Sequence, residues 1–73
     1  MDFNQLLKRY GAGERDFNGC NLAGTNLAHA QLPGIDLSDA FLGSANLSRA
    51  ILFQARFPNA FLYGADLSFA KLD

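Results

Sequence analysis

Apolar side chains recur at every fifth residue along most of the chain. Counting from Phe17, each fifth position as far as Leu72 is leucine or phenylalanine, and the residue two before it is alanine in eight of twelve repeats. We call these the centre and the small position. A period of five suits neither an α-helix, where successive centres advance by about 140°, nor a straight strand, where they alternate between faces. All centres share one core only if the chain turns a corner in every repeat, which predicts a β-solenoid.

Turn-forming residues recur two positions after the centres. A corner there needs a residue that tolerates a positive φ, as glycine, asparagine and aspartate do. Pro33-Gly34 is the most specific case, because proline sets the first angle of a type II turn and glycine takes the second. Residues of these three types stand at six corners: Gly19, Gly24, Gly34, Asp39, Asn59 and Gly64. The turn residues therefore agree with the hydrophobic period.

The repeats resemble the A(D/N)Lxx unit of the pentapeptide-repeat proteins. The matching segments are Asn21-Leu22-Ala23-Gly24, Ala45-Asn46-Leu47-Ser48-Arg49 and Ala65-Asp66-Leu67-Ser68-Phe69. The resemblance covers Arg15 to Asp73, and the opening from Leu6 to Phe17 is similar to the start of many cyanobacterial members. It implies a right-handed, four-sided β-helix with four repeats per coil and with centres and small positions facing inward.

With four repeats per coil, residues twenty apart lie in one column. Leu27 is then expected under Leu47 and Leu67. Four large and four small side chains in each layer would fill a narrow square interior without voids. The expected fold class is an all-β solenoid, a right-handed quadrilateral β-helix of just under three coils, about 14 Å long at ~4.8 Å per layer.

The N-terminal segment predicts a cover for the first coil. Asp2 can cap a helix with Gln5 three residues on, and Gly11 supplies a stop. Arg15, at the first small position, is expected to mark the boundary beside the helix. We therefore expect a short capping α-helix over Phe3 to Tyr10, with residues 1–14 forming the helix and linker and residues 15–73 the β-helix. The apolar residues at helical spacing are Phe3, Leu6, Leu7 and Tyr10.

No cover is visible after the last repeat, where the pattern continues through Leu72 to Asp73. Two explanations stay open. The chain is a piece of a longer repeat protein, or two copies stack end to end through the C-terminal coil and form a homodimer.

Size and charge narrow the class of partner. The 73 residues of 7.9 kDa allow one small domain. Six basic against seven acidic residues give a net charge of -1, too balanced for an electrostatic grip on nucleic acid or an anionic membrane. No apolar run approaches the ~20 residues of a membrane span. We expect a cytoplasmic protein that binds neither nucleic acid nor membrane.

Candidate catalytic groups are few. Cys20 occupies a small position and is expected inward, whereas His29 is at an outward corner, so the two cannot pair as nucleophile and base. There is no metal-ligand spacing of cysteine and histidine, and no glycine-rich phosphate loop. We expect no enzyme activity, no cofactor and no metal.

Large apolar residues at outward positions form the candidate interaction surface. They gather in the later coils, where aromatic side chains could anchor a protein partner. The alternative is stacking of Phe41 on Phe61 between coils, which needs no partner. The candidate residues are Phe41, Phe61 and Tyr63 on one side, Ile51 and Phe53 on the opposite side, and Phe69 at a corner.

Three functions follow. The first is a structural or protein-interaction module that presents a rigid repetitive surface to an unknown partner. The second is mimicry of DNA, since some members of the resembled family occupy the DNA-binding saddle of DNA gyrase as inhibitors or protectors. Residues 16–73 disfavour it, because five carboxylates against three basic side chains leave a net charge of only -2. The third is a localising segment of a larger cyanobacterial protein.

Overall fold

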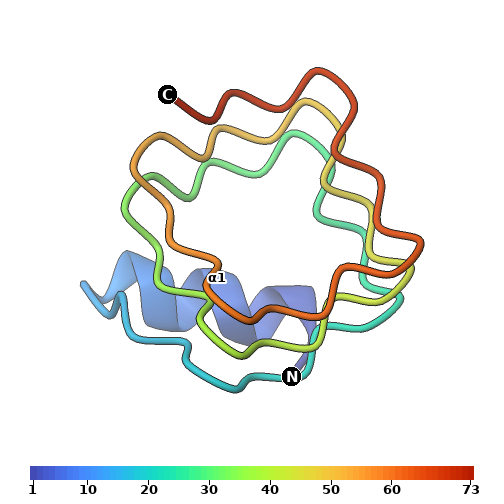
Figure 1. The fold of residues 1–73 in the computed structure, drawn as a ribbon. Helices are drawn as coiled ribbons and strands as arrows, with labels where there is room; N and C mark the ends of the chain where they lie inside the picture. The colour runs from blue at the N-terminus through green and yellow to red at the C-terminus, as the bar shows by residue number, and fades with distance from the viewer.

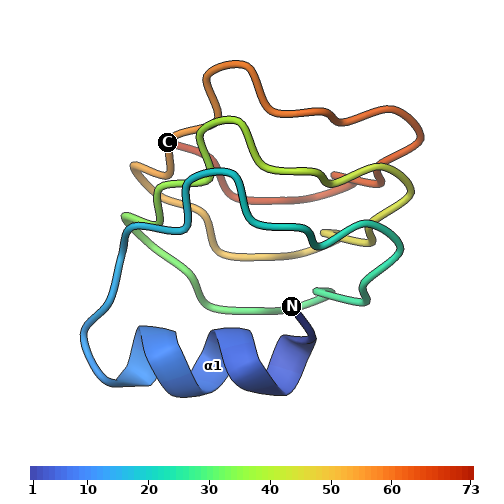
Figure 2. The ribbon, with the colours of Figure 1, turned by 90° about the horizontal axis from the view of Figure 1, so that it is seen from below.

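The chain begins with one helix, α1 (Phe3–Gly11), and then winds as four-sided coils stacked on one another (Figure 1). The structure, a computed structural model, describes residues 1–73. α1 lies across the N-terminal end of the stack, and the last coil lies farthest from it (Figure 2). The molecule measures 29 × 22 × 21 Å along its principal axes.

A reciprocal capping box starts α1. The Asp2 carboxylate accepts a hydrogen bond from the Gln5 N–H at 2.8 Å, and the Gln5 side chain accepts one from the Asp2 N–H at 3.0 Å. The helix runs through Gly11, one residue beyond the expected end. The positive φ of +100° falls at Gly13 instead, so Gly13 reverses the chain and the assignment of the stop to Gly11 was wrong.

The corners follow one backbone pattern. The carbonyl of each centre from Phe17 to Leu67 accepts the N–H three residues later, as between Leu37 and Ala40 at 3.1 Å. The residue two after each of these centres has a positive φ, as in a type II turn. The expected positive φ of Gly34 is confirmed at +73°. Seven corners hold a residue other than glycine, five more than turn chemistry had suggested: His29, Asp39, Ser44, Arg49, Gln54, Asn59 and Phe69. Coiling therefore imposes this conformation on whatever residue stands at the corner.

Successive coils are joined by parallel bridges between residues twenty apart. Each bridge is a single residue pair, and the structure contains no strand, because the chain turns again before a second pair can form. The expected all-β solenoid thus holds its layers together without extended sheets. The bridging columns are Asp16, Asp36 and Arg56 on the first side; Asn21, Phe41 and Phe61 on the second; Asn26, Asn46 and Asp66 on the third; and Gln31, Ile51 and Lys71 on the fourth.

The core fills the interior of the coils. Leu27 and Leu47 stack beneath Leu67 as expected, and the first two are fully buried while Leu67 is partly buried. Leu6 of α1 is also fully buried, so the helix closes the N-terminal end of the core. At the other end Leu72 remains 53% exposed. The centres of the first two coils are therefore fully buried, whereas those of the last coil are only partly buried or exposed.

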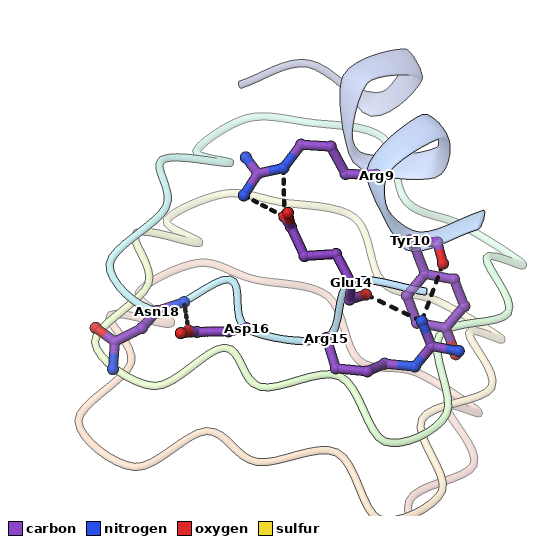
Figure 3. Close-up of polar contacts among 6 residues, drawn as sticks. All are labelled: Arg9, Tyr10, Glu14, Arg15, Asp16 and Asn18. Atoms are coloured by element: carbon purple, nitrogen blue, oxygen red, sulfur yellow. Dashed lines mark hydrogen bonds and ion pairs between the residues drawn. The ribbon is translucent and has the colours of Figure 1, made fainter. Parts of the chain in front are cut away.

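Polar and aromatic contacts attach the linker to the first coil (Figure 3). The Arg15 guanidinium lies 3.6 Å from the centroid of the Tyr10 ring and donates to the carbonyl oxygens of Tyr10 and Glu14 at 2.9 Å each. Glu14 pairs with Arg9 on α1, and the Tyr10 hydroxyl donates to the Pro33 carbonyl at 2.6 Å. Arg15 thus stands at the junction of helix and coils, as expected.

Candidate interaction surfaces

The second side carries an exposed aromatic column. Phe41 and Phe61 occupy bridging positions one coil apart, and their rings stack with centroids 5.0 Å apart and planes 3° apart. The stack expected as the alternative to partner binding is therefore present. It leaves the two side chains 46% and 57% exposed, and Tyr63 is 92% exposed. We call Phe41, Phe61 and Tyr63 the aromatic face.

The three remaining candidate residues lie elsewhere. Phe53 is 39% exposed on the fourth side, on the other side of the coil from the aromatic face. Ile51, which is half-buried, and Phe69, which is 75% exposed, line an open hollow of about 580 Å³. The six residues therefore form two surfaces, with Phe53 outside both.

The hollow lies between two columns of the coil. The corner column brings Phe69 under the Arg49 guanidinium, 4.8 Å from the ring centroid. The bridging column of the fourth side supplies the opposite wall. We call this site the basic hollow, and its six lining residues are His29, Gln31, Arg49, Ile51, Phe69 and Lys71.

The basic members of this site were not predicted from the sequence. His29 was expected only as an outward corner residue, and Lys71 was given no role. The signal was nevertheless present, because the twenty-residue stacking rule places Lys71 beside Ile51 and Arg49 beside Phe69. Apolar and charged residues were considered separately, although the coil places side chains of both types next to each other.

Two aspartates have a lowered pKa because of local turns. The Ser38 hydroxyl and N–H both donate to the Asp36 carboxylate, and these hydrogen bonds lower its pKa below the ordinary value of 3.8. Ser68 lowers the pKa of Asp66 in the same way. Both carboxylates are therefore ionised at neutral pH, and their hydrogen bonds serve the turns.

Cys20 and His29 differ in their exposure to solvent. Cys20 is partly buried against the core, and burial raises the pKa of its thiol, which reduces the reactive thiolate. His29 is exposed at its corner. No group of three or more His, Cys, Asp or Glu residues is placed to hold a metal ion. No helix of this structure has the length and apolar character needed to cross a membrane.

Comparison with known proteins supports the repeat assignment. The family model of pentapeptide repeats matches residues 16–52 and 45–73, with eight copies of the repeat. Among curated proteins, no match is found.

Solved structures similar to this chain are cyanobacterial pentapeptide repeat proteins. Rfr23 from Cyanothece 51142 is 33% identical over 80% of this chain and 36% of its own, with a TM-score of 0.55. HetL from Nostoc sp. strain PCC 7120, involved in heterocyst differentiation regulation, is 40% identical over 96% of this chain and 32% of its own, with a TM-score of 0.54. Alr5209 from Nostoc PCC 7120 is 30% identical over 99% of this chain and 76% of its own, with a TM-score of 0.55.

The chain spans about a third of the length of Rfr23 and HetL. The family match nevertheless covers the repeats from residue 16 to residue 73, and the coil, corners and columns of the structure follow the same unit. This chain therefore belongs to the pentapeptide repeat family.

Proposed function

We propose that the chain is a non-enzymatic module of just under three coils that binds a protein partner through the aromatic face. The observation that carries this proposal is the 92% exposure of Tyr63 beside the half-exposed Phe41 and Phe61. Stacking accounts for the position of the two phenylalanine rings but leaves Tyr63 without a packing role.

The aromatic face has the properties of a binding anchor. Tyrosine and phenylalanine contribute much of the energy at protein interfaces because they bury large areas and lose little rotamer freedom. The coil holds Phe41 and Phe61 at a fixed spacing, so a partner need not order them on binding. A regulatory role of this kind is known for the similar protein HetL, which is involved in regulation of heterocyst differentiation.

The test compares F61S/Y63S with F53S, which removes an exposed aromatic ring from the fourth side. Affinity capture from the source cells identifies the partner, and calorimetry measures its binding. We expect at least tenfold weaker binding for F61S/Y63S, because two anchors are lost, and unchanged binding for F53S. Circular dichroism should show all three proteins folded alike. Full binding by F61S/Y63S would exclude the aromatic face.

We also propose that two copies associate end to end through the last coil. Leu72 is 53% exposed, whereas Leu32 and Leu52 in the same column are fully buried. A second copy stacked on the last coil would cover Leu72. Light scattering should give twice 7.9 kDa for the wild type and the monomer mass for L72E. A monomeric wild type at millimolar concentration would contradict this arrangement.

A further inference from the structure

The basic hollow contains cationic groups without partners in the protein. Arg49 and Lys71 take part in no ion pair, and the only ion pair of the structure joins Arg9 to Glu14. The Arg49 Cζ lies 4.8 Å from the centroid of the Phe69 ring, and the guanidinium donates no hydrogen bond within the protein. A guanidinium with unused donors can bind a carboxylate through two parallel hydrogen bonds.

The lining of the hollow does not balance its own positive charge. None of the six lining residues is acidic, although the whole chain has a net charge of -1. On the first side, by contrast, basic Arg56 and acidic Asp36 occupy successive bridging positions of one column, although they form no ion pair. The acidic residues nearest to the hollow along the chain are Asp66, on the third side, and Asp73, two residues after Lys71.

The hollow also offers apolar contact. Half-buried Ile51 and the exposed ring of Phe69 lie among the polar groups of its lining. Its two columns each cross three coils, which at ~4.8 Å per step gives a length of about 10 Å. That length accommodates three or four residues of an extended peptide at ~3.3 Å each.

We propose that the basic hollow binds an acidic segment of a partner protein, with carboxylates on Arg49 and Lys71 and an apolar side chain against Ile51 and Phe69. The site is separate from the aromatic face. It lies at the corner between the third and fourth sides, diagonally opposite the corner where Phe41 and Phe61 stand. The inference therefore does not depend on binding through the aromatic face.

Charge distribution favours a peptide over a nucleic acid. A polynucleotide gains affinity by neutralising several phosphates along its backbone. The hollow has only two fixed positive charges, and a longer polyanion would extend toward Asp66 and Asp73. A short segment with two carboxylates and an apolar residue would extend less far toward Asp66 and Asp73 than a polynucleotide.

To test this proposal, peptides are selected from a displayed library of random twelve-residue sequences for binding to the whole 73-residue protein. Peptides that also bind the R49Q/K71Q variant are removed by counter-selection. We expect the enriched peptides to contain Asp or Glu together with an apolar or aromatic residue. Their affinity should fall at least tenfold in R49Q/K71Q and with added salt. It should not change in K8Q/R56Q, which removes the same charge elsewhere, or in F61S/Y63S.

Chemical-shift mapping locates the bound peptide on the protein. The largest amide shifts should fall on residues 29, 31, 49, 51, 69 and 71. An absence of enriched peptides, enrichment of neutral peptides, or equal binding by R49Q/K71Q would overturn the proposal. Tighter binding of a twelve-residue oligothymidylate through the same residues would also overturn it and assign the hollow to nucleic acid.

Discussion

At the scale of single residues, the corners show how the coil overrides local preference. Left-handed backbone costs a residue other than glycine about 1–2 kcal/mol, yet Phe69, Arg49 and Gln54 adopt it. The inter-coil hydrogen bonds and the filled core repay that strain collectively. Turn chemistry could therefore predict Gly34 and Asp39 as corners, whereas Phe69 and Arg49 are corners because they stand two residues after a centre.

Gly34→Ala tests the cost of this backbone conformation. A Cβ at Gly34 would meet no atom within 4 Å, so any loss comes from its φ of +73°. We expect the free energy of unfolding to fall by about 1 kcal/mol in urea titration. Gly11→Ala is the matched control, because it also meets no atom but lies in α1, where alanine is favoured. Equal effects of the two changes would contradict this explanation.

The two serine-bonded aspartates predict a pH dependence. Their pKa values are lowered in the folded chain, so their stabilising contribution is present above the pKa of the unfolded chain and is lost as the pH falls below about 4. D36N/D66N should lose less stability between pH 5 and pH 2 than the wild type does. Asparagine can replace aspartate in this turn, since the Asn46 side chain accepts from the Ser48 N–H at 2.9 Å. If the free energy of unfolding, measured by urea titration, falls equally in D36N/D66N and in the wild type between pH 5 and pH 2, the two carboxylates are excluded as the cause.

At the scale of elements, the coil and α1 were predicted from the sequence, whereas the absence of strands and the basic hollow were not. The five-residue period predicted a coil with the Leu and Phe centres inside, and the capping box predicted α1, because both depend on neighbours in the chain. The columns of residues twenty apart followed only from the resemblance to pentapeptide-repeat proteins, which implies four repeats per coil. The absence of strands was not predicted, since a period says nothing of how far each bridge extends. The basic hollow was missed although residues twenty apart, such as Ile51 and Lys71, were expected in one column, because charged and apolar outward residues were considered separately.

Leu47 and Leu67 occupy one column at different depths, which predicts unequal losses on truncation. Leu47 is fully buried, so L47A should lower the free energy of unfolding by about 2–5 kcal/mol. L67A should cost less, because Leu67 is only partly buried. Urea titration of both variants measures the difference. A larger loss for L67A would mean that the last coil is covered in solution.

At the scale of the whole molecule, the two ends of the stack differ. Fully buried Leu6 on α1 closes one end, and Leu72 leaves the other end open. Repeat proteins open most readily from an uncovered end, because each repeat is held mainly by its neighbours. We therefore expect local opening to cost less free energy in the last coil than in the first coil, which α1 covers.

Hydrogen exchange followed by NMR can detect this gradient. The Leu22 and Leu27 amides of the first coil and the Leu42 and Leu47 amides of the second all donate to carbonyls one coil later at 2.6–2.8 Å. At micromolar concentration we expect faster exchange for the second pair, because their acceptors belong to the open last coil. Uniform protection would show that the stack opens only as one unit. At high concentration an end-to-end dimer should slow the exchange of the Leu42 and Leu47 amides.

The in-register bridges between residues twenty apart also constrain how the chain can change length. Duplicating a block of twenty residues adds one whole coil and leaves every surface column continuous. Duplicating a single repeat of five residues instead shifts all later residues by one side of the coil, which would move Tyr63 from its present side to the next one. Lengthening by whole coils therefore preserves a binding surface, and lengthening by single repeats produces a new surface from the same side chains.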